Sequence, residues 1–125
     1  MIKFLMQTFP NFPSENDFEN WEVFNHEIYL KSNEEKKKEI RRATCLARYN
    51  IEKEKKYSWM ENYFFSDLNI EQLENKTLLD LGCFTGGRLL AWSENYKLKK
   101  SCGIDINPIF KTAADEFAKE KNINA

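Results

Sequence analysis

The spacing of apolar residues changes along the chain from a helical period to a strand-like one. Between residues 32 and 64 there is no glycine or proline, and a broken stripe recurs every three or four positions. The stripe runs through Ile40, Ala43, Ala47, Asn50 or Ile51, Tyr57, Met60 and Phe64. This pattern predicts one long helix or two shorter ones, and Ser32-Asn33-Glu34-Glu35 fits a capping box at its start.

The second half of the chain predicts an α/β fold. Residues 76–82 are a short apolar run typical of a buried strand, and residues 100–105 are interpreted as a second short strand. A helix is expected between them, from about 88 to 96. Pro108 suits the first turn of another helix. Its expected inner stripe is Phe110, Ala113, Ala114, Phe117 and Ala118. The order strand, helix, strand, helix is the beginning of a parallel sheet.

These patterns divide the chain into three parts. Residues 1–31 form an irregular, aromatic-rich arm with one helical turn, and residues 32–68 form the helical N-terminal segment. Residues 69–125 begin the α/β domain. The aromatic cluster at 57–65 is interpreted as core packing, although a lid or a docking surface stays open.

The amino-acid composition limits the classes of partner that we expect this chain to bind. The 125 residues are 42% hydrophobic and 31% charged, as in an ordinary globular protein, with a net charge of −1. Such a balance gives no field that attracts nucleic acid or an anionic membrane. The basic run at 36–42 is therefore interpreted as a solvated helix face, and no apolar run is long enough to span a membrane.

Cysteine and histidine usage excludes several kinds of site. Cys45, Cys83 and Cys102 are widely spaced, without the pattern of a metal site or a disulfide framework. We therefore expect reduced thiols in the cytoplasm. His26 is the only histidine. We expect no bound metal and no histidine-based catalytic triad.

Residues 80–87, DLGCFTGG, lie at a strand-to-helix turn and carry the candidate chemistry. Glycines there allow positive φ and the close approach of a ligand. Asp105 follows Gly86 by 19 residues and closes the second strand, where an acid can bind ribose hydroxyls. The spacing predicts a nucleoside-binding crevice, and we expect Asp80 and Asp105 to share it.

The same residues favour a cofactor without phosphates. A dinucleotide fingerprint requires glycines where this chain has Gly82, Phe84 and Gly87, and a phenylalanine at the second place would crowd a pyrophosphate. Asp80 would repel phosphates but attract a sulfonium or an ammonium group. S-adenosylmethionine (SAM) is therefore preferred, and NAD stays as an alternative.

Residues 76–87 resemble motif I of class I SAM-dependent methyltransferases, D/E-x-G-x-G-x-G, and residues 102–108 resemble the acidic segment that follows it. The resemblance implies a Rossmann-like fold. It also implies that Asp80 lies near the methionine end of SAM, that Gly82 and Gly86 form the loop beneath it, that Asp105 binds the ribose and that Ile106 packs on the adenine.

Two residues with larger side chains, Cys83 and Phe84, lie between the glycines of the loop. Phe84 replaces the middle glycine of the family pattern, and we expect its ring to turn toward the sheet or to cover the cofactor. Cys83 belongs to the cofactor-binding loop but is interpreted as a small apolar filler, because no base stands near it in the sequence.

The resemblance covers only about residues 74–121 and identifies no catalytic residue. Two strands make an incomplete sheet with an exposed edge, so a truncated product, a gene fragment or a piece that pairs with another chain is expected. Three functions stay open. They are a methyltransferase with an unidentified acceptor, for which a small molecule is favoured, a non-catalytic SAM-binding or interaction module, and an NAD- or nucleotide-dependent enzyme.

Overall fold

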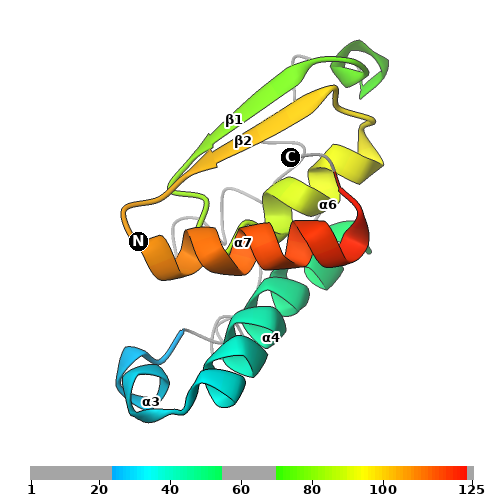
Figure 1. The fold of residues 1–125 in the computed structure, drawn as a ribbon. Helices are drawn as coiled ribbons and strands as arrows, with labels where there is room; N and C mark the ends of the chain where they lie inside the picture. The colour runs from blue at the N-terminus through cyan, green and yellow to red at the C-terminus, as the bar shows by residue number, and fades with distance from the viewer. Residues whose placement is uncertain (1–23, 55–69, 124–125) are drawn as a thin grey trace, which may run out of the picture.

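The structure is a computed structural model that describes residues 24–54 and 70–123 (Figure 1). Its elements are α3 (His26–Lys31), α4 (Glu34–Lys53), the 3-10 helix η1 (Ile70–Leu73), β1 (Thr77–Leu81), α6 (Gly87–Asn95), β2 (Lys100–Ile104) and α7 (Pro108–Lys121). The predicted order of strand, helix, strand and helix is confirmed. Helix α6 begins at Gly87 rather than at residue 88.

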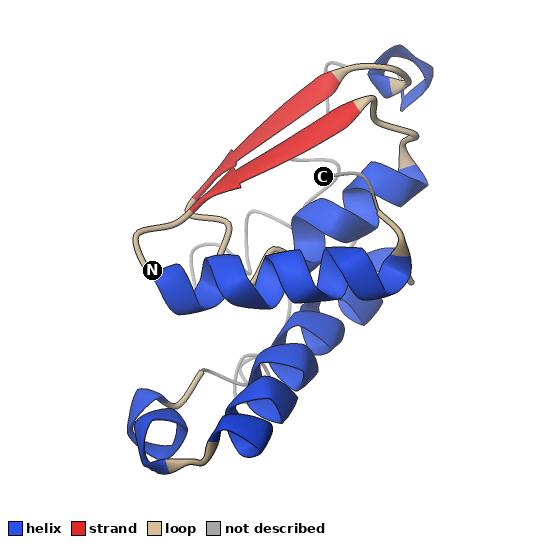
Figure 2. Ribbon diagram, in the orientation of Figure 1, coloured by secondary structure: helices blue, strands red, loops and turns tan. Residues whose placement is uncertain are grey.

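Strands β1 and β2 form a parallel two-stranded sheet, in which Leu79 is paired with Cys102 and Leu81 with Ile104. Helix α6 is the crossover between them. Figure 2 shows α4, α6 and α7 on the same side of this sheet. The carboxyl ends of both strands therefore meet at one edge, with the β1–α6 loop beside them.

The expectation that the first strand is buried is wrong for one face of the sheet. Leu79, Leu81 and Ile104 are 54%, 71% and 52% exposed, whereas Ser101 on the other face is 1% exposed. Successive side chains in a strand point to opposite faces. Because the long helices cover only one face, the apolar residues of the opposite face stay open among the described residues.

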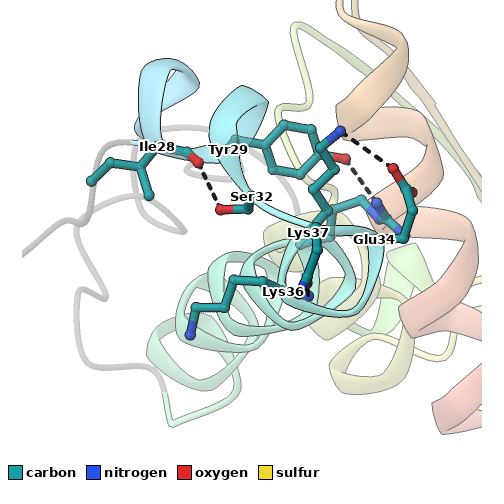
Figure 3. Close-up of polar contacts among 8 residues, drawn as sticks. Ile28, Tyr29, Ser32, Glu34, Lys36 and Lys37 are labelled. Carbon is teal, nitrogen blue, oxygen red and sulfur yellow. Dashed lines mark hydrogen bonds and ion pairs between the residues drawn. The ribbon is translucent and has the colours of Figure 1, made fainter.

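The start of α4 differs by one residue from the predicted capping box. Ser32 ends α3, where its hydroxyl donates to the carbonyl of Ile28 at 2.7 Å (Figure 3). Asn33 is the N-cap, and its side chain accepts a hydrogen bond from the amide of Lys36 at 2.8 Å. Asparagine is at least as good an N-cap residue as serine, so this shift of the cap by one residue does not reduce the stability of the helix.

The buried face of α4 also differs from the predicted stripe. Its buried residues are Thr44, Cys45, Tyr49 and Glu52. Ala43, Ala47 and Asn50 are exposed, because α6 and α7 pack on the neighbouring side of the helix. Cys45 and Tyr49 pack with Leu90, Ala91 and Phe117 in one core cluster. Ile40 and Ile51 of the predicted stripe are half-buried. The rest of the stripe and the aromatic cluster at 57–65 lie outside the described residues.

Helix α7 follows its prediction. Asn107 caps its first turn by accepting from the amide of Ile109 at 3.0 Å, and Pro108 begins the helix. Phe110, Ala113 and Phe117 are buried, and the two other predicted stripe residues are half-buried. Apolar residues three or four positions apart thus set the inner face of this helix.

Two bidentate ion pairs join α7 to α4. The guanidinium of Arg41 donates to both oxygens of Glu116 at 2.9 and 2.8 Å, and Arg42 binds Glu120 at 2.8 and 2.7 Å. Arg41 also donates to the hydroxyl of Tyr29 at 2.7 Å. Hydrogen bonds from Arg41 lower the pKa of Glu116 below its ordinary value of 4.5.

We predict that this pair makes stability depend on pH. Because the folded pKa of Glu116 lies below the unfolded one, its stabilisation is present above about pH 4.5 and is lost as the pH falls. Glu116→Gln should lower the free energy of unfolding at pH 7 by about 0.5–1 kcal/mol, a small value because the carboxylate is partly exposed.

The variant should also flatten the loss of stability below pH 4.5. Urea unfolding at several pH values measures both effects. Glu74→Gln, at an exposed position in a turn, is the control and should change neither. Equal pH profiles for Glu116→Gln and the wild type would contradict the prediction.

Candidate functional site

The loop that follows β1 is bonded to the end of β2. The amides of Gly82 and Cys83 both donate to the carbonyl of Ile104, at 2.7 and 3.1 Å. The loop then turns into α6, where the amide of Gly86 donates to the carbonyl of Cys83 at 3.0 Å. Residues 82–86 and 104–107 therefore form one compact edge of the molecule.

Two glycines of this loop have the backbone geometry that the sequence predicted. Gly82 has φ +74° and Gly86 has φ +75°, in the left-handed region that favours glycine. A Cβ on Gly86 would lie 2.8 Å from the Cβ of Ala114 on α7, whereas a Cβ on Gly82 would meet nothing within 4 Å. Gly86 thus permits close helix packing, and Gly82 presents its backbone to open space.

Asp105 joins the two sequence motifs. One carboxylate oxygen accepts from the amide of Phe84 at 3.0 Å, and the other accepts from the amide of Asn107 at 2.9 Å. The structure thus brings Asp105 to the glycine-rich loop, as the spacing predicted. Since a carboxylate has about four lone-pair sites, two backbone bonds leave capacity for hydroxyl donors from a ligand.

The ring of Phe84 packs against α7, and whether it also covers a cofactor stays a prediction. The φ of this residue, +54°, is the left-handed conformation that would suit the glycine of the family pattern. The ring packs against Phe110 of α7 with centroids 4.4 Å apart, and Phe110 in turn contacts Phe24 at 5.3 Å. Aromatic packing against the helices therefore holds a residue in a backbone conformation that costs free energy.

Asp80 lies on the helix-facing side of β1 and has a partner that the sequence analysis missed. Its carboxylate lies 3.4 Å from the guanidinium of Arg88, in the first turn of α6. The side chains are 16% and 20% exposed, and the guanidinium also lies over the ring of Trp92, 5.5 Å from its centroid. A cation directly after a glycine-rich loop, in the first turn of the helix, was a signal that could have identified Arg88.

A cavity of about 630 Å³ near the loop lies between β2 and α7. Cys83, Gly86 and Asp105 line it, and Asp80 does not. The expectation that both acids share one cleft is therefore wrong for this cavity. Asp80 points toward α6, because the alternation of side chains along β1 places it on the covered face.

Cys83 fits the interpretation as a filler. Its sulfur occupies the space where a side chain on Gly103 would lie, 2.6 Å from the position of a Cβ. Burial and the carboxylates of Asp80 and Asp105 raise the pKa of its thiol. A thiol that keeps its proton is a poor nucleophile. Ile106, the residue expected at the adenine, is fully exposed beside this edge.

Comparisons of the chain with protein-family models, with curated proteins and with solved structures found no match. Within residues 24–54 and 70–123, no helix is both long and apolar enough to cross a membrane. The same part of the chain holds no group of three histidine, cysteine or acidic side chains placed to bind a metal ion. Cys45, Cys83 and Cys102 are free thiols.

We predict that Asp105→Ala destabilises the fold by about 1–3 kcal/mol, because two partly buried backbone amides lose their acceptor. Asp115→Ala is the matched control, since its exposed i,i+4 pair with Lys111 should contribute less than about 0.5 kcal/mol. Urea unfolding of both variants measures the difference. Equal effects would show that the bonds of Asp105 do not hold the loop.

Proposed function

We propose that this chain carries the cofactor-binding part of a SAM-dependent methyltransferase with a Rossmann-like fold. The observation that supports this most directly is the bond from the amide of Phe84 to Asp105, which unites the two segments that resemble the family. The open side of Gly82 and the exposed Ile106 leave room beside that bond. We place the activity in the cytoplasm, on the basis of the three free thiols.

In this proposal the backbone at Gly82 and the loop residues Cys83, Phe84 and Gly86 support the cofactor, and Asp105 accepts hydrogen bonds from the ribose. Ile106 offers its exposed side chain to the adenine. SAM supplies an electrophilic methyl group on a sulfonium, and the protein's task is to align donor and acceptor. The acceptor is unidentified, with a small molecule preferred because the net charge of −1 indicates no nucleic-acid surface.

The Asp80–Arg88 pair changes the electrostatic argument made from the sequence. Asp80 is not a lone negative charge, because Arg88 balances it at 3.4 Å. A ligand that carries only a cation would gain less here than a zwitterion. The amino-acid end of SAM carries both an ammonium and a carboxylate, so the pair supports placing that end near Asp80 and Arg88.

The same pair supports a second candidate. A guanidinium beside a glycine-rich loop can bind phosphate, and this favours an NAD- or nucleotide-dependent enzyme more than the sequence did. The bulky Phe84 counts less against a pyrophosphate than expected, because its ring packs away against Phe110. Direct titration with each cofactor separates the two candidates.

Calorimetric titration of the full chain with SAM, S-adenosylhomocysteine and NAD tests the proposal. We expect SAM and S-adenosylhomocysteine to bind with dissociation constants in the micromolar range and NAD not to bind. The reason is that, in this proposal, the loop and Asp105 bind a nucleoside that carries no phosphates. Binding of NAD without SAM would establish the second candidate. No binding of any of the three would remove both.

We predict that Arg88 contributes to the binding of SAM through the amino-acid end of the cofactor. Arg88→Gln should lower the affinity of the chain for SAM about tenfold, as expected for the loss of a charge-assisted hydrogen bond. The affinity of the variant for 5′-methylthioadenosine, which lacks the amino-acid end, should equal that of the wild type. Lys53→Gln on α4 is the control. Equal losses for both ligands would show that Arg88 supports the loop rather than the amino-acid end.

The third function, a SAM-binding module without catalysis, is supported by the bonding of the two carboxylates beside the loop, because Asp105 accepts from two backbone amides and Asp80 is paired with Arg88. Methyl transfer from labelled SAM to a small-molecule extract, with the intact chain, separates binding from catalysis. Binding without transfer favours the module. Transfer that is lost in Asp105→Ala establishes the enzyme.

A further inference from the structure

An aromatic stack leads from the glycine-rich loop to the N-terminal helix α3. The ring of Phe84 in the loop contacts the ring of Phe110 on α7, with centroids 4.4 Å apart. Phe110 contacts the ring of Phe24 at 5.3 Å, with the two ring planes at 87°. Figure 1 shows α3 on the side of α7 away from the sheet. The stack therefore connects the loop, through the first turn of α7, to the residue that precedes the N-cap of α3.

Within the described part of the chain, α3 packs on the other helices mainly through two aromatic side chains. Phe24 and Tyr29 are each 6% exposed, whereas Ile28 and Leu30 are 57% and 67% exposed. The hydroxyl of Tyr29 accepts a hydrogen bond from the guanidinium of Arg41 at 2.7 Å. A helix of six residues is not stable by itself in water. We therefore expect α3 to dock and undock as one unit, together with these two rings.

The backbone of Phe84 has a conformation that residues other than glycine seldom adopt. Its φ is +54°, which costs free energy in a residue that carries a side chain. The same conformation directs its amide to the carboxylate of Asp105 at 3.0 Å. Packing of the ring in the stack offsets this cost, so loss of the stack should turn the amide away from Asp105. A glycine at position 84, as in the family pattern, would adopt a positive φ without the stack.

We propose that Phe24 is a positioning residue for the candidate site. It acts through Phe110 and Phe84 and thereby controls the bond between the loop and the carboxylate of Asp105. Docking of α3 keeps that carboxylate oriented for the hydroxyls of a ribose. The coupling rests on the function proposed above only for the identity of the ligand, a nucleoside cofactor. By thermodynamic linkage, a cofactor whose affinity increases when α3 is docked must favour the docking of α3 by the same factor.

Amide hydrogen exchange on the isotope-labelled full chain tests the coupling without any ligand. Phe24→Ala should speed the exchange of the Phe84 amide about tenfold. The amide of Lys99, which donates to Lys76 at the other end of the sheet, should exchange as in the wild type. Leu30→Ala, at an exposed position of α3, is the control and should change neither. Equal acceleration of both amides in Phe24→Ala would indicate a general loss of stability and would contradict the proposal.

Cofactor affinity gives a readout that a merely structural role would not produce. Phe24→Ala should lower the affinities for SAM and for 5′-methylthioadenosine by the same factor, about fivefold, because both ligands carry the ribose. In a Phe84→Gly background, the same substitution should change either affinity by less than about twofold, since glycine keeps a positive φ without the stack. Calorimetric titration of the full chain measures these affinities. Equal effects of Phe24→Ala in both backgrounds would refute the coupling.

The two kinds of measurement distinguish failure of the coupling from failure of the proposed function. If neither ligand binds the wild type, the proposed function fails, and exchange of the Phe84 amide in the free chain still decides the coupling. If SAM binds, the amides of Tyr29 and Ser32, which are hydrogen-bonded in α3, should exchange about fivefold more slowly in the complex.

This last measurement uses the wild type, so it is valid even if Phe24→Ala does not fold. Phe24→Leu, which keeps an apolar side chain, replaces the alanine variant in that case and should give a smaller acceleration at the Phe84 amide. Unchanged exchange of the α3 amides in the presence of bound SAM would overturn the proposal.

Discussion

The hydrogen bond from the amide of Phe84 to the carboxylate of Asp105 is the interaction on which the candidate site depends. It joins a loop after the first strand to a turn after the second, across 21 residues of sequence. Charge-assisted bonds of this kind are about twice as strong as neutral ones. The second oxygen of Asp105 holds Asn107, which caps α7, so one side chain sets both the loop and the start of the next helix.

Helix α4 supports the same loop from behind. The thiol of Cys45 donates to the carbonyl of Thr85 at 3.1 Å, and both residues are fully buried. Burial raises the pKa of this thiol to about 12, so it stays protonated and keeps its role as a donor. Gly87 lets α6 approach α4, since a Cβ there would lie 2.7 Å from the amide nitrogen of Tyr49. The N-terminal helix is therefore part of the scaffold of the loop.

Local chemistry made much of the fold predictable, and tertiary packing accounts for most errors. The glycines at 82 and 86, the cap at Asn107 and the inner stripe of α7 follow from rules that apply within a few residues. The buried face of α4 does not, because residues far apart in the sequence choose which side is covered. Thr44 and Glu52 are polar, so a search for apolar periodicity passes over the face that α6 and α7 cover.

In the candidate site, too, the features that depend on tertiary packing could not be predicted from the local sequence. Glycine-loop spacing placed Asp105 correctly, because the carboxyl ends of parallel strands must meet at one edge. It could not show that Arg88 balances Asp80, or that Phe84 packs on Phe110, since both depend on how α6 and α7 are oriented. A motif therefore predicted which residues gather at the edge more reliably than the direction in which each side chain points.

The alternation along β1 links the two unusual features of this molecule. It turns Asp80 toward α6 and, at the same time, turns Leu79 and Leu81 to the open face. A nucleoside needs only the loop, Asp105 and the edge between them, all of which a single strand–helix–strand unit provides. Alignment of a methyl acceptor requires side chains held on the far side of the cofactor. The same strand pattern can thus shape the edge at the loop while leaving apolar side chains of one sheet face exposed among the described residues, so binding and catalysis need not reside in the same set of elements.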